Sequence, residues 1–367
     1  MLRKIVLDKE FISAKHGTYL TLGYVVGTAL LLSPTATILT AKQDAWLAPL
    51  LAAIPGLLLI ALLTSLNRMY PGQSLIQYSS SILGWPGKLL GLLILWFTFH
   101  LGALVLRNIL TFVSSIMLFQ TPPTVILIFT VALTAYGVKL GIETLARAFK
   151  ILIFLVVIGF SIVHIYSMLS ANYSNLLPVL SRGFKPILHS AVNFTAFPVG
   201  EIIVFSLLIF HIHKPQQVGP SLTAGLLAGI LVLVLSIERA IVTLDPERSS
   251  RAIFTTITGL SSAPGGRLLM PIMALNTFVF SICKFFICYY GFVLGTSHWF
   301  KLSDYKPLIL PAGALFILFA LYLHSNAIEE FTFAATIWPV YALPIQFGVP
   351  LLLWLVAILK NALKSQR

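Results

Sequence analysis

The sequence has few charged residues, and acidic residues are especially scarce. Of its 367 residues 10% are charged, and 11 aspartates and glutamates stand against 24 lysines and arginines. A soluble protein of this length is expected to carry about 25% charged residues, so this composition excludes a water-soluble globular protein. Hydrophobic residues make up 58% of the chain instead. We therefore expect a lipid bilayer to be its solvent.

Cysteine and enzyme motifs are scarce as well. Cys283 and Cys288 lie five positions apart in an apolar stretch, which places them on different faces of a helix. We expect two buried thiols, neither a disulfide nor a metal motif. His211 and His213 lack a third ligand at metal-binding spacing, and we find no phosphate-binding loop, dinucleotide fingerprint, zinc-protease motif or nucleophile elbow. The sequence therefore predicts no enzyme activity, no cofactor and no metal.

Long polar segments are also missing, because apolar stretches of about 20 residues recur from Leu20 to Leu359 with short polar breaks. The pattern predicts an all-α polytopic membrane protein with about ten transmembrane helices. Residues 1–367 would form a single integral membrane domain. The helices are expected near residues 16–41, 46–69, 87–118, 122–139, 144–169, 184–213, 217–244, 265–297, 306–325 and 331–359.

The net charge of +13 is spread over the loops between these helices. It forms no basic patch with interleaved aromatic residues, so nucleic-acid binding is not expected. The first residues lack the layout of a cleaved signal peptide. Under the positive-inside rule both termini are predicted to be cytoplasmic. The inner face would hold Arg3, Lys4, Lys9, Lys15, Arg68, Lys88, Lys139, Arg147, Lys214, Lys301, Lys306, Lys360, Lys364 and Arg367, and the outer face Lys42, Arg182, Lys185, Arg248, Arg251 and Arg267.

Two of the predicted helices contain helix-breaking residues in their middle. The first contains G-T-A-L-L-L-S-P, from Gly27 to Pro34, and the sixth contains N-F-T-A-F-P-V-G-E-I-I, from Asn193 to Ile203. A break in a helix leaves backbone N–H and C=O groups without partners, and lipid cannot bind them, so broken helices occur where the break lines a cavity. The alternative is that these residues only kink the helix or allow close packing. Each is the first helix of a five-helix half, so their spacing predicts repeats at about 16–169 and 184–359.

The broken helices also suggest a binding site. Backbone N–H groups at the helix 1 break would bind a carboxylate, and open carbonyls at the helix 6 break would accept an ammonium group, so an α-amino acid would fit between them. The predicted ligand-binding residues are Gly27, Thr28, Ala29, Thr195, Ala196, Phe197, Gly200 and Glu201.

Five motifs occur in a characteristic order: G-T-A-L-L-L-S-P, L-F-Q-T-P-P, Y-G-V-K-L-G-I-E-T-L-A-R, N-L-L-P-V-L and F-P-V-G-E. Over about Gly27 to Glu201 the chain resembles the spore germination receptor B subunits, which are permease-like members of the amino acid–polyamine–organocation superfamily. The resemblance implies a five-plus-five inverted-repeat (LeuT-like) transporter fold with broken helices 1 and 6.

The resemblance also implies a function and partners. The chain would sense a nutrient germinant, such as an amino acid, in the inner membrane of bacterial endospores. Its expected partners are a second membrane subunit and a lipoprotein subunit. A proton-coupled amino acid transporter of the same superfamily and a nutrient-gated ion pathway are the alternatives that the residues leave open.

Three charged residues inside helices are functional candidates. Glu201 follows the helix 6 break, where it would bind an amine, carry a proton or only cap a half-helix. In superfamily members a lysine can replace the sodium ion between helices 1 and 8, and Lys284 is our candidate for that role, with Lys150 as its rival. Lys150 would otherwise extend to the interface.

The remaining intramembrane charges favour structural roles. We expect Arg107 to pair with a carboxylate or with freed carbonyls. Glu143 and Arg147 are spaced for an ion pair along one helix.

Overall fold

A computed structural model describes residues 10–262 and 265–365. Arg3, Lys4, Lys9 and Arg367, which contributed to the predicted orientation, lie outside the described residues. The α-helices are α1 (Ala14–Val26), α2 (Ala29–Ala41), α3 (Leu47–Met69), α4 (Leu75–Leu83), α5 (Trp85–Phe112), α6 (Pro123–Leu140), α7 (Ile142–Met168), α8 (Lys185–Phe194), α9 (Val218–Leu244), α10 (Pro246–Arg251), α11 (Thr255–Ser262), α12 (Met270–Phe300), α13 (Ile309–Tyr322), α14 (Ala327–Thr332), α15 (Trp338–Leu343) and α16 (Val349–Ser365).

Between the α-helices lie short 3₁₀ and π segments. The 3₁₀ segments are Lys42–Asp44, Tyr173–Leu176, Gly200–Leu207, Ile209–His211, Pro215–Gln217, Gly266–Leu269 and Lys306–Leu308. The π segments are Val113–Met117, Thr195–Val199, Phe333–Ile337 and Pro344–Gly348. An isolated parallel bridge joins Ile12 to Ile212.

The apolar segments match the predicted membrane spans. In the described residues, eight helices are long and apolar enough to cross a membrane, and α1 and the segment from Ala29 to Asp44 form a further pair bent by 48°. A shorter apolar helix runs from Lys306 to Tyr322. We call α1 with α2 helix 1, residues 185–207 helix 6, α12 helix 8 and residues 327–363 helix 10.

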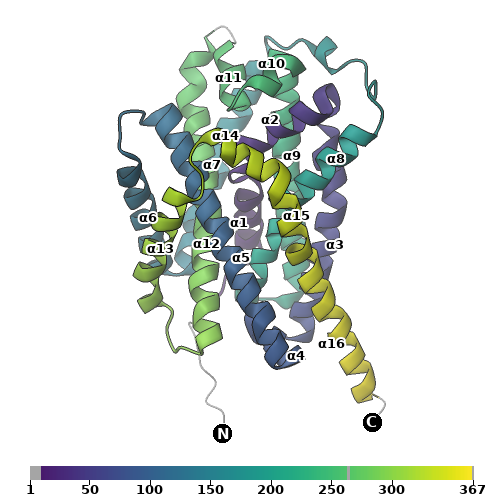
Figure 1. The fold of residues 1–367 in the computed structure, drawn as a ribbon, viewed down its shortest axis with the longest axis vertical. Coiled ribbons are helices and arrows are strands. Elements are labelled where there is room, and N and C mark those ends of the chain that lie inside the picture. The colour runs from purple at the N-terminus through teal and green to yellow at the C-terminus, as the bar shows by residue number, and fades with distance from the viewer. Residues whose placement is uncertain (1–9, 263–264, 366–367) are drawn as a thin grey trace.

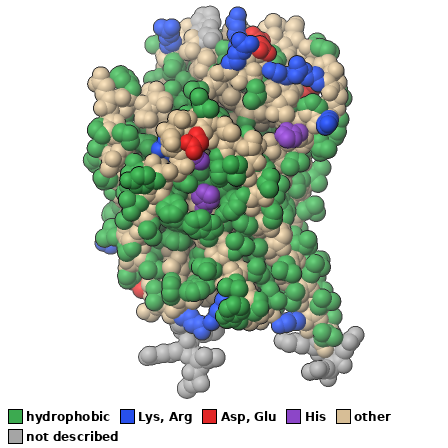
Figure 2. All heavy atoms as spheres, viewed as in Figure 1, with side chains coloured by type: hydrophobic (Ala, Val, Ile, Leu, Met, Phe, Trp, Pro, Cys, Tyr) green, Lys and Arg blue, Asp and Glu red, His purple; other side chains and the backbone are tan. Residues whose placement is uncertain are grey.

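The helices form an upright bundle with α10 and α11 at one end and α4 at the other (Figure 1). On the face shown in Figure 2, basic side chains gather toward the two ends and a broad hydrophobic band lies between them. Large apolar side chains in the spans point outward, such as Phe154 (54% exposed) and Leu231 (58% exposed). This surface is suited to lipid, so the chain is an integral membrane protein.

Helix 1 lies in the interior of the bundle because small residues let neighbours approach it. It packs against α7, α9 and α12. Gly225 and Gly229 of α9 are four apart, the spacing of small residues that lets membrane helices pack closely. A β-carbon on Gly225 would lie 2.6 Å from the Thr18 carbonyl oxygen, and one on Gly229 would lie 2.8 Å from Val25.

Candidate functional site

Helix 1 breaks at Gly27, whose backbone angles (φ 23°, ψ −129°) are unfavourable for a residue with a side chain. Its N–H still donates to the Gly23 carbonyl at 2.9 Å, and the new helix starts when Leu31 donates to the Thr28 carbonyl at 3.1 Å. The break therefore spans two residues. Lys284 of α12 fills the space beside it, since a β-carbon on Gly27 would lie 2.6 Å from Lys284 Cδ.

Helix 6 breaks over a longer stretch. After α8 the chain forms a π turn in which Phe197 is extended (φ −143°, ψ 114°), and a 3₁₀ segment follows from Gly200. Extended backbone inside a helix leaves carbonyls without helical partners. The Ala196 carbonyl accepts hydrogen bonds from Gln346 Nε2 at 2.8 Å and from Trp338 Nε1 at 3.2 Å. Helix 10 thus satisfies the carbonyl that helix 6 exposes.

A buried ion pair lies between the two breaks. Lys284 Nζ is 2.5 Å from Glu201 Oε2, and both side chains are 0% exposed. The ammonium group also lies 4.6 Å from the centre of the Phe197 ring and 5.4 Å from that of Tyr24, while the Tyr24 hydroxyl donates to the Glu201 carbonyl at 2.9 Å. Glu201 Oε1 has no hydrogen-bond partner among the described residues. This pair joins helices 1, 6 and 8 at a single point.

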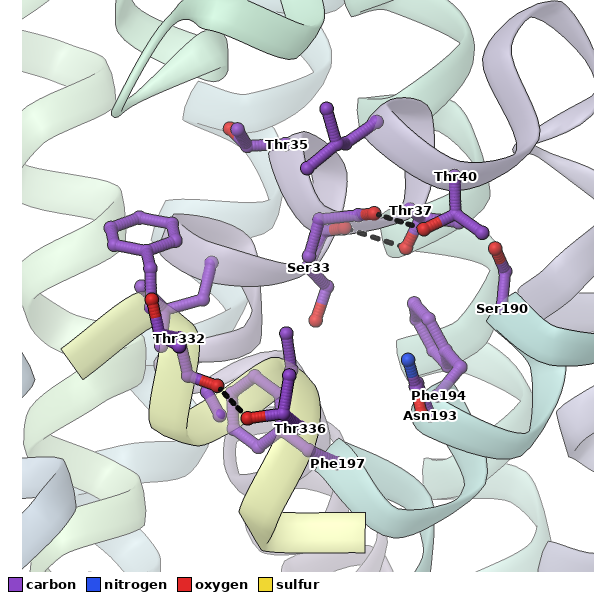
Figure 3. Close-up of a pocket in the computed structure, with 16 residues that line it drawn as sticks. Ser33, Thr35, Thr37, Thr40, Ser190, Asn193, Phe194, Phe197, Thr332 and Thr336 are labelled. Atoms are coloured by element: carbon purple, nitrogen blue, oxygen red, sulfur yellow. Dashed lines mark hydrogen bonds between the residues drawn. The ribbon is translucent and has the colours of Figure 1, made fainter. Parts of the chain in front are cut away.

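A cavity of about 270 Å³ lies between α2, α8 and the start of helix 10, and we call it the α2–α8 cavity (Figure 3). Its lining contains hydroxyl and amide side chains and aromatic rings but no charged side chain. The polar members are Ser33, Thr35, Thr37, Thr40, Ser190, Asn193, Thr332 and Thr336, and the rings are Phe194, Phe197 and Phe331. The hydroxyls of Ser33 and Ser190 are buried without a hydrogen-bond partner in the described part of the chain. Their hydrogen-bonding capacity is therefore unused within the described structure.

A second cavity, of about 30 Å³, reaches the ion pair, and we call it the Glu201 cavity. Its polar lining comes from Glu201, Asn108, Glu330 and Trp338. Leu32, Phe197 and Ala334 line both cavities. Those three side chains therefore separate the α2–α8 cavity from the buried carboxylate.

Two of the predicted ligand-binding residues reach these cavities: Phe197 lines both, and Glu201 lines the smaller one. Gly27, Thr28 and Ala29 are fully packed. The structure brings Lys284 beside Gly27 and Glu201, whereas its rival Lys150 lies half-buried on α7. The ligand contacts and the cation-replacing role stay predictions. So does the division into a single domain with two repeats.

The other charged residues form local pairs. The predicted ion pair between Glu143 and Arg147 is present. Arg107 pairs with a carboxylate, since its Nε lies 3.8 Å from Glu330 Oε2, and its guanidinium donates to the Ala320 carbonyl at 3.3 Å. Cys283 and Cys288 are buried free thiols. No group of three metal-ligating side chains occurs in the residues that the structure describes.

Sequence reasoning missed the contribution of helix 10. Glu330, Trp338 and Gln346 are 2%, 2% and 0% exposed. Glu330 contacts α5, and Trp338 and Gln346 contact helix 6. A lone amide in the apolar run Y-A-L-P-I-Q-F and a carboxylate at the start of a membrane helix were the signals that could have found Gln346 and Glu330.

Comparisons with known proteins agree with this geometry. The family model described as "Spore germination protein" matches residues 11–328. Spore germination protein KB of Bacillus subtilis (strain 168) is 26% identical over 365 residues, 97% of this chain and 96% of that protein. Spore germination protein YndE of the same organism is 25% identical over 359 residues, 94% and 96% of the two chains.

Solved transporter structures share the fold. MhsT in complex with L-phenylalanine superposes with a TM-score of 0.67 at 15% identity, and the match covers 95% of this chain and 99% of that one. This likeness confirms the predicted LeuT-like transporter fold with broken helices 1 and 6.

Proposed function

The chain belongs to the spore germination protein family, and on this premise we propose that it is a nutrient-sensing membrane subunit of a spore germination receptor. It would bind a small polar nutrient, such as an amino acid, between the two broken helices. The family and the transporter fold support a transport-like or germinant-sensing membrane protein. No enzymatic step is part of this proposal.

One observation carries the proposal: the α2–α8 cavity lies between the second half of helix 1 and the first half of helix 6. Ligand sites in inverted-repeat transporters form where such half-helices meet. The buried hydroxyls of Ser33 and Ser190 lack partners in the described structure and line this cavity. A ligand that hydrogen-bonds to them would relieve their desolvation.

The dimensions suit a small ligand. A volume of about 270 Å³ is close to the lower end of typical small-molecule pockets. Phe194, Phe197 and Phe331 supply apolar contact area, and the hydroxyl and amide groups supply orientation. Because Phe197 also contacts the Lys284 ammonium, a ligand that displaced its ring would alter the ion pair that joins helices 1, 6 and 8. Binding would thereby change helix packing.

A proton-coupled transporter is the second candidate, and the Lys284–Glu201 pair favours it. A titratable pair at the meeting point of the broken helices can couple protonation to a rearrangement of those helices. A lysine at this place would take the role of a cation between helices 1 and 8. Substrate uptake into proteoliposomes driven by a pH gradient would distinguish transport from sensing.

The proposal places the chain in the inner membrane of the spore with both termini in the cytoplasm. The end of the bundle with α10 and α11 would then face outward, and the α2–α8 cavity would open on that side. A second membrane subunit and a lipoprotein subunit are the proposed partners, and co-purification of the three chains tests that assembly.

The binding test uses purified protein in lipid nanodiscs and a panel of single nutrients. A nutrient that raises the unfolding temperature of the wild type identifies the ligand class. Its Kd is then measured for the double variant Ser33→Ala/Ser190→Ala, and we expect it to rise about tenfold or more because two hydrogen bonds are lost. Ser236→Ala is the matched control, since it removes another buried hydroxyl without a described partner, one that lines neither cavity.

Spores that carry the same variants give the physiological result. The double variant should need a higher nutrient concentration to germinate, and the control should germinate as the wild type does. Unchanged affinity and dose response in the double variant at normal membrane levels would remove the α2–α8 cavity as the nutrient site.

A further inference from the structure

The Glu201 cavity brings together two carboxylates from helices far apart in the sequence. Glu201 belongs to helix 6 and Glu330 to helix 10, and both line this cavity of about 30 Å³. The two residues are 0% and 2% exposed. Carboxylates at membrane depth are costly and indicate function by default.

The cavity has room for a water molecule, and its lining includes four polar side chains, Glu201, Asn108, Glu330 and Trp338. Buried water needs about 10–15 Å³ of accessible space and two or more polar partners. Glu201 lines this space, and its buried Oε1 has no hydrogen-bond partner among the described residues. Glu330 and Asn108 also line the cavity, while its other lining groups are mainly apolar. A water molecule here would bridge the two carboxyl groups.

Glu330 is incompletely neutralised in its site. Thr111 donates to its Oε2 at 2.8 Å, and Asn108 is close enough to donate to its other oxygen. Arg107 Nε stays 3.8 Å away, beyond hydrogen-bond distance, and its guanidinium donates to the Ala320 carbonyl instead. The guanidinium therefore offsets part of the cost of burying a charged carboxylate, but it forms no hydrogen bond with it. The Glu330 site therefore suits proton binding better than a rigid ion pair.

We propose that Glu330 is a second proton-binding site, and that it exchanges protons with Glu201 through water in the Glu201 cavity. A protonated Glu330 gives its proton to the water, and the same water gives a proton to the Glu201 carboxylate. Glu330 ends as a carboxylate and Glu201 as a carboxylic acid, so charge and atoms balance. Glu330 lies in the first turn of α14 beside Glu329, whose side chain is 51% exposed, so Glu330 would be the first of the two sites to receive a proton.

The charged and titratable neighbours of the two carboxylates are known from the packing. Beside Glu330 and the adjoining start of helix 10 lie Arg107, His324, Glu329 and His100, and beside Glu201 lie Lys284, Tyr24 and Cys288. Lys284 holds Glu201 Oε2, so the free oxygen Oε1 is the atom that faces the relay. Protonation of Glu201 would weaken its attraction for Lys284 and loosen the contact between helices 6 and 8.

The relay can be tested without any nutrient. Time-resolved infrared spectroscopy after a rapid pH drop follows the C=O band of a protonated buried carboxylic acid in the reconstituted full chain. Glu201→Gln and Glu330→Gln each remove one band and so assign it. In Glu330→Gln we expect the Glu201 band to rise about tenfold or more slowly and to reach its full amplitude, because relayed proton transfer is lost while the acceptor remains.

Two further variants keep the test decisive. Glu329→Gln is the matched control, a neighbouring carboxylate on the same helix that does not line the Glu201 cavity, and it should leave the rate unchanged. Leu104→Phe fills the cavity while keeping both carboxylates, and it should slow the Glu201 band as Glu330→Gln does, even if Glu330→Gln fails to fold. An unchanged rate in either Glu330→Gln or Leu104→Phe, or the lack of a band assigned to Glu330, would overturn the relay.

Discussion

Helices 1 and 6 are both broken inside the bundle, and different interactions stabilise the two breaks. In helix 1 the break is two residues long, and the stem of Lys284 packs against Gly27. In helix 6 the α-helix ends at Phe194, a π turn with an extended Phe197 follows, and a 3₁₀ segment continues to Leu207. The helix 1 break is thus closed by packing, whereas the helix 6 break is closed by hydrogen bonds from helix 10.

This difference assigns different roles to the neighbouring helices. Helix 8 supports the helix 1 break through one side chain, whose ammonium group reaches across to Glu201 in helix 6. Helix 10 supports the helix 6 break through Trp338 and Gln346. Two π turns interrupt helix 10; Trp338 follows the first of them and Gln346 lies within the second. Single π turns are frequent at functional sites. Helix 10 is therefore coupled to helix 6 through the hydrogen bonds that it donates to the break.

The largest loss of stability is expected from breaking the Lys284–Glu201 ion pair, which lies between the two breaks. Lys284→Met leaves the Glu201 carboxylate buried and unpaired, which should lower the free energy of unfolding by about 3–5 kcal/mol. Lys284→Met/Glu201→Gln should recover most of that loss, because the second change removes the orphaned charge. Unfolding titrations of these two variants and of Glu201→Gln alone, in detergent micelles, measure the cycle. A double variant as unstable as the single one would show that the pair is not what joins helices 6 and 8.

Each break contains a glycine, and we expect a smaller loss of stability, different at the two sites, when that glycine is replaced by alanine. A methyl group on Gly27 meets Lys284 and lies 2.7 Å from the Tyr24 carbonyl, at a positive φ. Gly27→Ala should therefore cost about 2–4 kcal/mol from strain and overpacking. Gly200 has an ordinary helical φ of −67°, so its methyl group would cause no backbone strain of this kind, although it would meet the Gln346 amide and lie 2.9 Å from the Thr195 carbonyl oxygen. Gly200→Ala should cost about 1–2 kcal/mol.

The same unfolding assay ranks these two variants. Equal losses would mean that the helix 6 break is as tightly packed as the helix 1 break, and the contrast between packing and hydrogen bonding would fail.

The contrast also marks the limit of sequence reasoning. The membrane class and the helix positions could be predicted from composition and spacing. The broken helices could be predicted as well, because helix-breaking residues occur at the breaks themselves: Gly27, Pro198 and Gly200. What closes each break comes from residues distant in the sequence. Gln346 lies 150 positions from Ala196, and Glu330 lies 219 positions from Thr111. No local pattern encodes those contacts, because the amide and the carboxylate find partners only after the bundle has packed.

The smallest effect concerns the hydrogen bonds that close the helix 6 break. The Ala196 carbonyl has two donors, so Gln346→Leu leaves the Trp338 indole in place and also removes a buried amide oxygen that has no partner among the described residues. The lost hydrogen bond and the removed unsatisfied oxygen partly offset each other, so the variant should lower the free energy of unfolding by about 1 kcal/mol or less.

Gln346→Leu combined with Trp338→Phe leaves the Ala196 carbonyl buried without a donor and should lower the free energy of unfolding by about 1–3 kcal/mol beyond the lost packing of the indole. Trp338→Phe alone is the control for that packing, and the quantity of interest is the non-additive part of the double variant, measured by unfolding titration. Strict additivity would mean that water replaces the lost donors, and helix 10 would then support helix 6 by packing alone.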